Sequence, residues 1–152
     1  MKRLKTIVLV AICFTTVPLT SAVAQEDEVR NAIVESLAAW RAADFQKLGT
    51  FYDARVRGYM LDGGMLLTGY NAAALDAAVS TGFAFALEPQ DIDILIVSPA
   101  VAVAVAIVEG SITLPGGATQ EGSWRYSETR VKEGGVWKVL QYHFSPLAQA
   151  EF

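Results

Sequence analysis

Cysteine and histidine are nearly absent from this sequence, which has one residue of each among 152. Cys13 lies in an apolar N-terminal stretch that we expect to be removed, so the remaining chain would have no disulfide, no thiol nucleophile and no thiolate metal site. His143 alone cannot form a histidine-rich metal site, although a carboxylate-based ion site is not excluded. We therefore expect neither a metal site nor a cofactor.

Basic residues are also scarce, since 12 Lys and Arg stand against 16 Asp and Glu and the net charge is −4. Nucleic-acid binding requires a basic face that neutralises phosphates, and binding to an anionic membrane surface requires a cluster of basic residues. The composition argues against both partners. Hydrophobic residues make up 53% of the chain, which excludes disorder, and the length corresponds to one domain.

The first 24 residues are typical of a secretory signal peptide. They open with three basic residues, Lys2, Arg3 and Lys5. An apolar run over residues 7–17 ends at Pro18, and a cleavage site of the A-x-A kind ends at Ala24. The alternative is a membrane anchor, but a spanning helix needs about 20 apolar residues and this run is shorter. We predict cleavage after Ala24, a periplasmic or secreted protein that is not bound to the membrane after cleavage, and one domain over residues 25–152.

Helical spacing dominates the first part of the remaining chain. Apolar residues recur at intervals of four and three from Val29 to Trp40, which predicts a helix over residues 29–40. Asp44 is a candidate N-cap for a short helix over residues 45–52, and Asn71 is a candidate N-cap for a helix over residues 72–86.

Strand patterns occur in two parts of the chain. In the first, the residues around Asp62 predict a hairpin turn between short strands over residues 55–61 and 65–68. The second part starts after Pro89. Residues 101–107 alternate bulky aliphatic side chains with alanine, and we expect this strand to be buried on both faces.

The last two predicted strands, over residues 123–132 and 136–144, meet at a Gly-Gly turn. Helices followed by hairpin-linked strands predict an α+β fold, with the N-terminal helices packed on the concave face of a curved antiparallel sheet. Such a cone-shaped arrangement offers a natural ligand pocket at its mouth or interior.

These two strands also carry a recognisable motif, S-E-T-R-V at residues 127–131 and V-W-K-V-L-Q-Y-H-F-S at residues 136–145. The motif resembles the C-terminal signature of the nuclear transport factor 2-like superfamily, most closely its SnoaL-like members and the association domain of calcium/calmodulin-dependent protein kinase. The resemblance covers residues 26–146 in the order of elements, and the last two strands residue by residue.

The resemblance implies a cone-shaped fold, a pocket between helices and sheet, and frequent dimerisation through the outer face of the sheet. In the association domain the arginine of T-R-V points into that pocket, and Arg130 matches it. The chain departs from the signature at Gln141, where the first histidine is expected, and at Phe144, where an arginine is expected. The second change removes a positive charge and weakens the case for a strongly anionic ligand.

Seven residues are our candidate ligand contacts: Arg130, Glu128, Tyr126, Trp124, Tyr142, Trp40 and Tyr59. Strand alternation places Trp124, Tyr126, Glu128 and Arg130 on one face of their strand. A buried cation needs an anionic partner. If that partner is Glu128 or Glu109, Arg130 has a structural role, which is the interpretation we favour; otherwise a carboxylate-bearing ligand would take the place.

No catalytic residue can be assigned from the sequence. His143 is a general base by residue type, but strict alternation sets it on the face of Trp137 and Val139, opposite Phe144. If Phe144 faces the pocket, His143 points outward. Several acids and tyrosines are available for proton transfer: Asp44, Asp53, Asp62, Glu109, Glu128, Tyr52, Tyr59, Tyr126 and Tyr142.

Three functional hypotheses follow. The first is an exported, homodimeric binding or assembly module with a pocket for a small apolar or carboxylate-bearing molecule. The second is an isomerase, dehydratase or cyclase that uses a pocket carboxylate and tyrosines. The third is a purely structural oligomerisation module.

Overall fold

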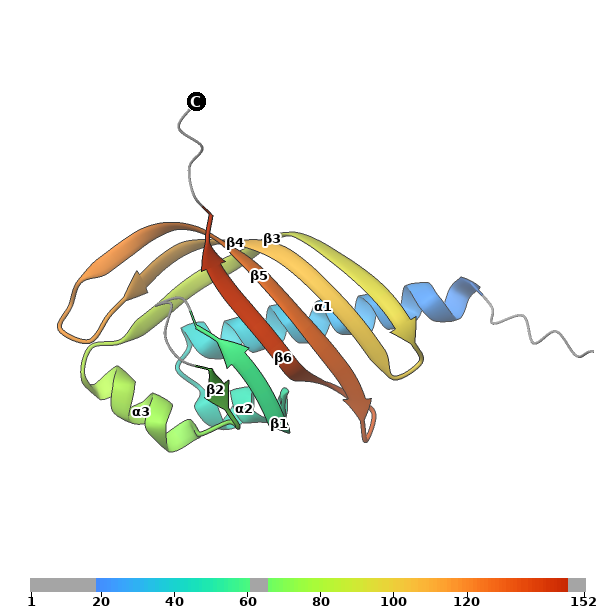
Figure 1. Ribbon diagram of the computed structural model, residues 1–152, viewed down its shortest axis with the longest axis horizontal. Helices are drawn as coiled ribbons and strands as arrows, with labels where there is room; N and C mark the ends of the chain where they lie inside the picture. Colours follow the sequence, from blue (N-terminus) through green and yellow to red (C-terminus); the bar gives the residue numbers. More distant parts are fainter. Residues whose placement is uncertain (1–18, 61–65, 148–152) are drawn as a thin grey trace, which may run out of the picture.

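A computed structural model describes residues 19–60 and 66–147. A long helix runs beneath a strongly bent sheet, and two short helices lie toward one end of it (Figure 1). The helices are α1 (Leu19–Arg41), α2 (Phe45–Thr50) and α3 (Ala72–Ser80). The strands are β1 (Tyr52–Tyr59), β2 (Leu67–Thr68), β3 (Ala84–Ser98), β4 (Val101–Thr113), β5 (Thr119–Glu133) and β6 (Val136–Pro146).

The six strands form one open sheet in the order β2-β1-β6-β5-β4-β3. The predicted α+β fold, with the N-terminal helix on the concave face of a curved sheet, is confirmed. The expectation of a wholly antiparallel sheet needs one correction, because β1 pairs with β6 in parallel while the other four pairs are antiparallel. The β5–β6 hairpin returns β6 in the direction of β1, so the first and last strands of the chain lie side by side inside the sheet.

The predicted first helix is present and extends further toward the N-terminus. Its apolar stripe is buried: Val29, Ile33, Leu37 and Trp40 are each 8% exposed or less. Both predicted caps are confirmed, since the Asp44 carboxylate accepts from the backbone N–H of Lys47 and the Asn71 amide oxygen accepts from that of Ala74. The stripe therefore fixes which side of α1 faces the sheet.

The prediction of a helix over residues 72–86 is wrong at its C-terminal end. Helix α3 stops at Ser80, and Gly82 follows with a φ of 96°, a conformation that glycine adopts without strain. Strand β3 starts at Ala84, so Pro89 lies inside a strand rather than before it. Proline is tolerated there because β3 is an edge strand and has one unpaired side.

Strand β4 is buried on one face only, which corrects the expectation for residues 101–107. Ala102, Ala104 and Ala106 lie in the core at 7% exposure or less, whereas Val105 on the opposite face is 45% exposed. The small side chains thus face α1, and the bulky ones lie on the outer face of the sheet.

A register shift in the β5–β6 pair changes the alternation along β6. Thr129 lies opposite Gln141 and Arg130 opposite Val139, so Leu140 is an extra residue. Trp137 and Val139 before the bulge therefore face the same side as Tyr142 and Phe144 after it, and all four are buried. The bulge brings two sets of aromatic side chains to the concave face.

Some predictions concern residues outside the described ranges. These are the hairpin turn at Asp62, Gly63 and Gly64, and the apolar part of the predicted signal peptide with Cys13. Within residues 19–60 and 66–147, no helix has the length and apolar character needed to cross a bilayer.

Candidate functional site

A buried polar network lies on the concave face of β5. Trp124, Tyr126, Glu128 and Arg130 all face inward, as the alternation predicts. Arg130 is fully buried and Glu128 is 1% exposed. Charges in such surroundings need close partners, because burying an isolated charge is costly.

All three nitrogens of the Arg130 guanidinium donate hydrogen bonds to groups within the protein. Its Nε donates to Oε1 of Glu128, and its Nη2 donates to Oε2 of Glu128 at 3.1 Å. Nη1 donates to the carbonyl of Trp137 at 3.2 Å, and Nη2 also donates to the hydroxyl of Ser36 on α1 at 3.0 Å. Glu128 is thus the partner of Arg130, whereas Glu109 is exposed and accepts from Ser123.

The same carboxylate accepts a hydrogen bond from the phenol of Tyr126. Burial opposes the charged form of Arg130, but the adjacent Glu128 carboxylate outweighs it and raises the pKa of Arg130 above its ordinary value. Burial, reinforced by the charge of Glu128, raises the pKa of Tyr126 well above 10. At neutral pH the network therefore contains a charged guanidinium and a protonated phenol.

A separate cavity of about 280 Å³ lies between α3, the end of α1 and strands β1, β2 and β6. Aromatic and aliphatic side chains dominate its walls, with Tyr52, Tyr70, Tyr142 and Trp40 as the large ones. The other lining residues are Met60, Leu67, Thr68, Gly69, Asn71, Ala74 and Leu75. No carboxylate, lysine or arginine belongs to this described lining.

The tyrosines of the cavity are packed together and largely fixed. The ring centroid of Tyr52 is 5.0 Å from that of Tyr70 and 6.0 Å from that of Tyr142. Trp40 Nε1 donates to the Tyr52 hydroxyl at 3.3 Å, and the Tyr70 hydroxyl donates to the carbonyl of Phe45 at 2.6 Å. The proton of Tyr52 is therefore not used in the contact with Trp40 and can be donated to a ligand.

Gly58 allows Tyr142 to reach this position. It pairs with Tyr142 across β1 and β6, and a Cβ at residue 58 would overlap the phenol ring. A glycine inside a strand is often explained by such a close approach.

The cavity phenols remain protonated near neutral pH. Burial raises the pKa of Tyr52 above its ordinary range, although the hydrogen bond from Trp40 works in the opposite direction. Burial and the charges of Asp76 and Asp44 raise the pKa of Tyr70 to about 12, and burial also raises the pKa of Tyr142. Because the Tyr70 hydroxyl already donates to Phe45, Tyr52 and Tyr142 are the phenols that can donate to a carbonyl or hydroxyl oxygen of a ligand.

The structure separates the seven candidate contacts into three groups. Trp40 and Tyr142 line the cavity. Trp124, Tyr126, Glu128 and Arg130 lie in the buried face of β5 and do not line it. Tyr59 is 44% exposed, and its ring lies 6.0 Å from that of His143 on the outer face.

Several cavity residues were not among the candidate contacts, most notably Tyr70 and Met60, and Tyr52 was considered only as a proton donor. Tyr70 follows a Thr-Gly pair and precedes the Asn71 cap, so an aromatic residue immediately before a helix cap was the only available signal.

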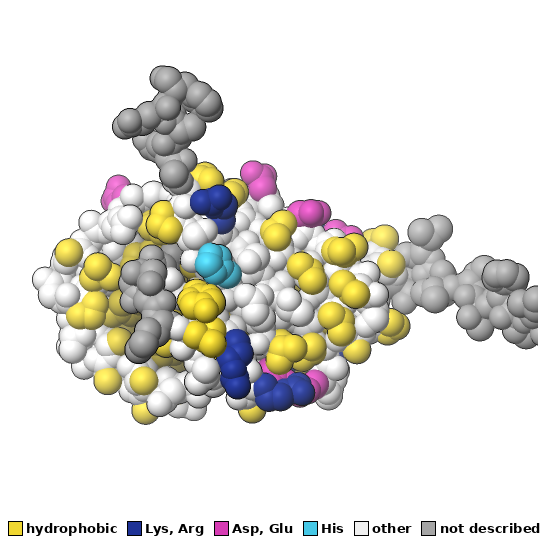
Figure 2. Space-filling view, viewed as in Figure 1, with side chains coloured by type: hydrophobic (Ala, Val, Ile, Leu, Met, Phe, Trp, Pro, Cys, Tyr) yellow, Lys and Arg dark blue, Asp and Glu magenta, His cyan; other side chains and the backbone are white. Residues whose placement is uncertain are grey.

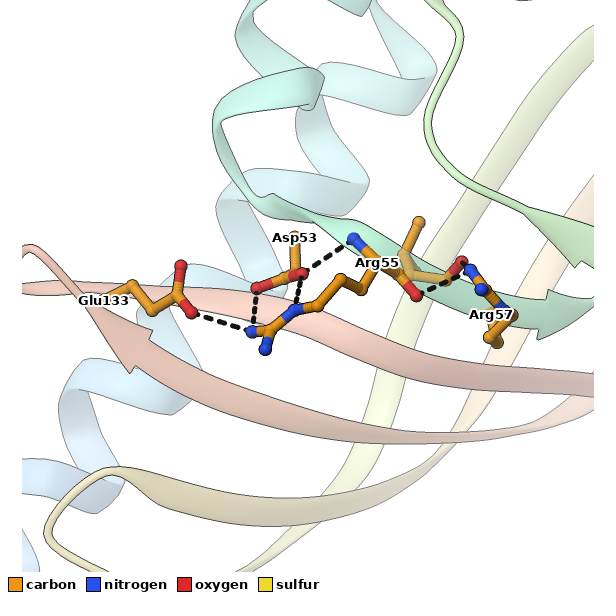
Figure 3. Close-up of polar contacts among 5 residues, drawn as sticks. Asp53, Arg55, Arg57 and Glu133 are labelled. Atoms are coloured by element: carbon orange, nitrogen blue, oxygen red, sulfur yellow. Dashed lines mark hydrogen bonds and ion pairs between the residues drawn. The ribbon is translucent and has the colours of Figure 1, made fainter.

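Four of the five carboxylates considered for proton transfer, Asp44, Asp53, Glu109 and Glu128, have other partners, and the fifth, Asp62, lies outside the described residues. Asp53 on β1 is 2% exposed. The Nε and Nη2 atoms of Arg55 donate to its two carboxylate oxygens, each at 2.8 Å. Figure 3 shows the Arg55 guanidinium between Asp53 and Glu133, with Glu133 also at 2.8 Å. The hydrogen bonds from Arg55 hold the pKa of Asp53 well below its usual range, which makes this carboxylate a weak base.

His143 is exposed on the outer face, away from the cavity, and this agrees with the expectation based on Phe144. The bulge at Leu140 explains this position. It places His143 on the face opposite to Trp137 and Val139, whereas strict alternation had placed all three on one face. Among the described residues, no group of three or more His, Cys, Asp and Glu side chains is placed to hold a metal ion.

Comparison with known proteins gives a family match and several structural relatives. The family model described as SnoaL-like domain matches residues 29–149. A search of curated proteins finds no match.

Three solved structures illustrate the shared fold. A ketosteroid isomerase-like protein from Erwinia carotovora atroseptica is 18% identical, with a TM-score of 0.69 over 81% of this chain and 96% of that one. A nuclear transport factor 2-like protein from Cytophaga hutchinsonii is 22% identical, with a TM-score of 0.69 over 81% and 98%. The association domain of calcium/calmodulin-dependent protein kinase II from C. elegans is 16% identical, with a TM-score of 0.65 over 82% and 98%.

Proposed function

The chain belongs to the SnoaL-like domain family, and we propose that it is an exported binding protein whose aromatic cavity holds a small neutral molecule. The observation that carries this proposal is the cavity lining, in which three tyrosines and a tryptophan surround a space without a charged side chain among the described residues. Apolar walls with a few hydrogen-bonding groups are typical of small-molecule sites. The protonated phenols select for a ligand with an oxygen acceptor.

A thermal-shift screen tests this proposal, because a ligand that binds only the native state raises its stability. Neutral aromatic ketones and phenols form one panel, and the corresponding benzoates form the second. We expect the neutral compounds to raise the melting temperature and the benzoates to have no effect. The same response to both panels would contradict the neutral-ligand proposal.

A cavity-filling variant tests whether the thermal shift arises from binding in the aromatic cavity. Ala74 lines the cavity from α3 and is solvent-exposed, so Ala74→Phe should fill the space without disturbing the core. Ala77→Phe places the same side chain at an exposed position of α3 that does not line the cavity. The thermal shift should disappear in Ala74→Phe and persist in Ala77→Phe; an unchanged shift in both would place the ligand elsewhere.

An isomerase, dehydratase or cyclase is the alternative, and the donor phenols together with the likeness to a ketosteroid isomerase-like protein favour it. Such donors stabilise negative charge developing on a carbonyl oxygen. This chemistry also needs a base, and the described lining contains no carboxylate. Deuterium uptake from D₂O at the α-carbon of a bound ketone, lost in Tyr142→Phe, would establish the enzyme; no uptake would leave the binding role.

We also propose a homodimer formed through an outer apolar patch, defined as Leu95, Val97, Val101, Val103 and Val131. Leu95 and Val97 are 64% and 58% exposed. Register places Leu95 beside Val103 and Val101 beside Val131, so the patch is continuous across β3, β4 and β5. Figure 2 shows hydrophobic side chains gathered over this end of the sheet. Contiguous exposed apolar surface is typical of an interaction site.

Sedimentation velocity tests the dimer. Leu95→Lys combined with Val97→Lys should convert it to a monomer, because two cations would be buried at the interface. Val136→Lys introduces a single lysine at a 41% exposed valine outside the patch and should leave the dimer intact. A wild-type protein that sediments only as a monomer would contradict this assembly.

Export and cleavage after Ala24 remain part of the proposal. The bond lies near the start of α1, where residues 22–24 are exposed and the buried stripe begins only at Val29, so cleavage is compatible with the packing of the helix. Cleavage there removes none of the core residues that the structure describes. N-terminal sequencing of protein from the cell envelope or medium should begin at Gln25, whereas an intact Met1 would contradict processing.

A further inference from the structure

A second, smaller hollow lies beside the aromatic cavity. It measures about 130 Å³, its lining includes Phe45, Val79, Phe83 and Phe85, and we call it the side hollow. Trp40 lines both the side hollow and the aromatic cavity, and no other residue of the described linings is shared. The two spaces therefore meet at one indole ring.

Helix α3 covers both spaces. Leu75 lines the aromatic cavity, and Val79, four residues later, lines the side hollow. Residues four apart in an α-helix lie on the same face, about 6 Å apart along the axis. The side hollow therefore begins about one helical turn beyond the wall of the cavity.

Trp40 is held in place from both sides. On the cavity side, its Nε1 donates to the hydroxyl of Tyr52 at 3.3 Å. Its ring centroid lies 5.6 Å from that of Phe45 and 5.1 Å from that of Phe85, and both phenylalanines line the side hollow. The ring cannot move aside without losing this hydrogen bond and these aromatic contacts, so it forms a fixed wall between the two spaces.

The side hollow suits an apolar group. Its walls are aromatic rings, alanines and Val79, and Arg41 is the one charged residue in the described lining. The guanidinium of Arg41 already has partners, because its Nη1 lies 2.7 Å from a carboxylate oxygen of Glu88 and donates to the carbonyl of Leu87 at 3.1 Å. An alkyl chain can therefore fill the hollow without leaving a charge unpaired.

We propose that Trp40 limits the length of the ligand that the aromatic cavity accepts. This inference rests on the binding role proposed for that cavity. The indole closes the cavity at the end of α1, so the wild type binds compact neutral molecules, and an alkyl chain directed toward α1 meets the ring. A smaller side chain at this position joins the two spaces, and the side hollow then receives the chain.

Two ketones that differ only in chain length test this role. Acetophenone is the compact ligand, and hexanophenone extends its alkyl chain by four methylene groups. Each methylene that becomes buried strengthens binding by roughly fourfold. In Trp40→Leu, the ratio of the two dissociation constants should shift in favour of hexanophenone by about tenfold or more relative to the wild type. Equilibrium dialysis measures both constants, and the ratio within one variant cancels the loss of the hydrogen bond to Tyr52, which affects both ketones.

Three further variants locate the chain. Phe85→Leu removes an aromatic ring from the side hollow but not from the cavity wall, and it should keep the ratio of the wild type. Val79→Phe, added to Trp40→Leu, should fill the side hollow and restore that ratio while acetophenone still binds. Trp40→Phe retains an aromatic ring, should shift the ratio in the same direction as Trp40→Leu, and decides the question if the leucine variant does not fold.

The outcomes separate this inference from the proposed function. The same ratio in the wild type and in the Trp40 variants would overturn the length-limiting role of Trp40, while acetophenone binding would still support the cavity as a binding site. A gain for hexanophenone that persists after Val79→Phe would also overturn it, because the chain would then lie elsewhere. No binding of either ketone to the wild type or to the Trp40 variants would contradict the binding role itself and this inference with it.

Discussion

Arg130 and Glu128 are two charged side chains enclosed by the core, and their pairing determines what each can do. A ligand carboxylate could reach the guanidinium only by displacing Glu128 and leaving it buried without a partner, which is strongly unfavourable. The contacts of Arg130 with Ser36 on α1 and with the Trp137 carbonyl on β6 indicate a different role. We infer that Arg130 joins α1, β5 and β6.

Replacement of Arg130 by methionine should lower the free energy of unfolding by about 3–5 kcal/mol, because the Glu128 carboxylate would stay buried without a counter-charge. Adding Glu128→Leu to the same chain should recover much of that loss. Arg125→Met, at an exposed arginine of the same strand, should change stability by less than about 0.5 kcal/mol. Urea unfolding followed by circular dichroism measures all three.

The contrary result would be a stability loss in Arg130→Met no larger than that of Arg125→Met. In that case the pair would contribute little to the folded state, and a ligand role for Arg130 would again be open. Binding of a cavity ligand provides a second readout, since it should survive in any Arg130 variant that folds.

At the scale of elements, the sequence predicted α1, α2 and both caps because each depends on local chemistry: a periodic apolar stripe, or a short polar side chain before a helix. The end of α3 was predicted too late. Residues 83–86 alternate phenylalanine with alanine, and so short an apolar run fits the end of a helix as well as the start of a strand. Only the pairing of β3 with β4, a contact distant in sequence, decides between them.

The edge strand β3 is protected by side chains from α1. Arg30 donates to the carbonyl of Ile92 at 3.0 Å and Arg41 to that of Leu87 at 3.1 Å, and Gln25 donates to the carbonyl of Pro99 in the turn after β3 at 3.1 Å. An exposed edge strand is a template for pairing with another chain. Carbonyls already bound to α1 are not available for such pairing, so α1 covers this edge as well as the core.

Replacing both Arg30 and Arg41 by alanine should therefore expose β3 and promote open-ended association of the native protein. Light scattering should show particles that grow with protein concentration, while the wild type keeps one size. Lys47→Ala removes a cation on α2 that contacts Glu35 but not β3, and it should behave as the wild type. If the double variant also kept a single size, the arginine contacts would be irrelevant to edge protection.

At the scale of the whole molecule, the order of elements and the motif in the last two strands were enough to predict the architecture, but not the position of the cavity. Alternation correctly grouped Trp124 with Arg130, yet the walls of the cavity come from five separate elements. Tyr52 and Tyr142 meet there because β1 pairs in parallel with β6 and because Leu140 shifts the register of β6. Neither long-range pairing nor a bulge leaves a local signal in the sequence.

The same parallel pair sets Asp53 at the start of β1 beside the β5–β6 hairpin, where Arg55 and Glu133 complete the cluster. The folded state lowers the pKa of Asp53, chiefly through hydrogen bonds from the Arg55 side chain and backbone. A depressed carboxyl pKa contributes stability above the unfolded value of about 3.9, and the contribution is lost as the pH falls through the folded pKa. The cluster should therefore weaken in acid.

Asp53→Asn should lower the stability at pH 7 by about 1 kcal/mol, a modest value because Arg55 is 65% exposed and solvent screens the pair. The difference between variant and wild type should shrink as the pH falls below about 4, since the carboxyl of the unfolded wild-type chain then takes up a proton while the folded state, with its lowered pKa, does not. Exposed Asp27, changed to asparagine, serves as the control with little effect at either pH. Thermal unfolding between pH 7 and pH 2.5 measures the two curves, and a constant gap across that range would exclude the Asp53–Arg55 charge interaction as its cause.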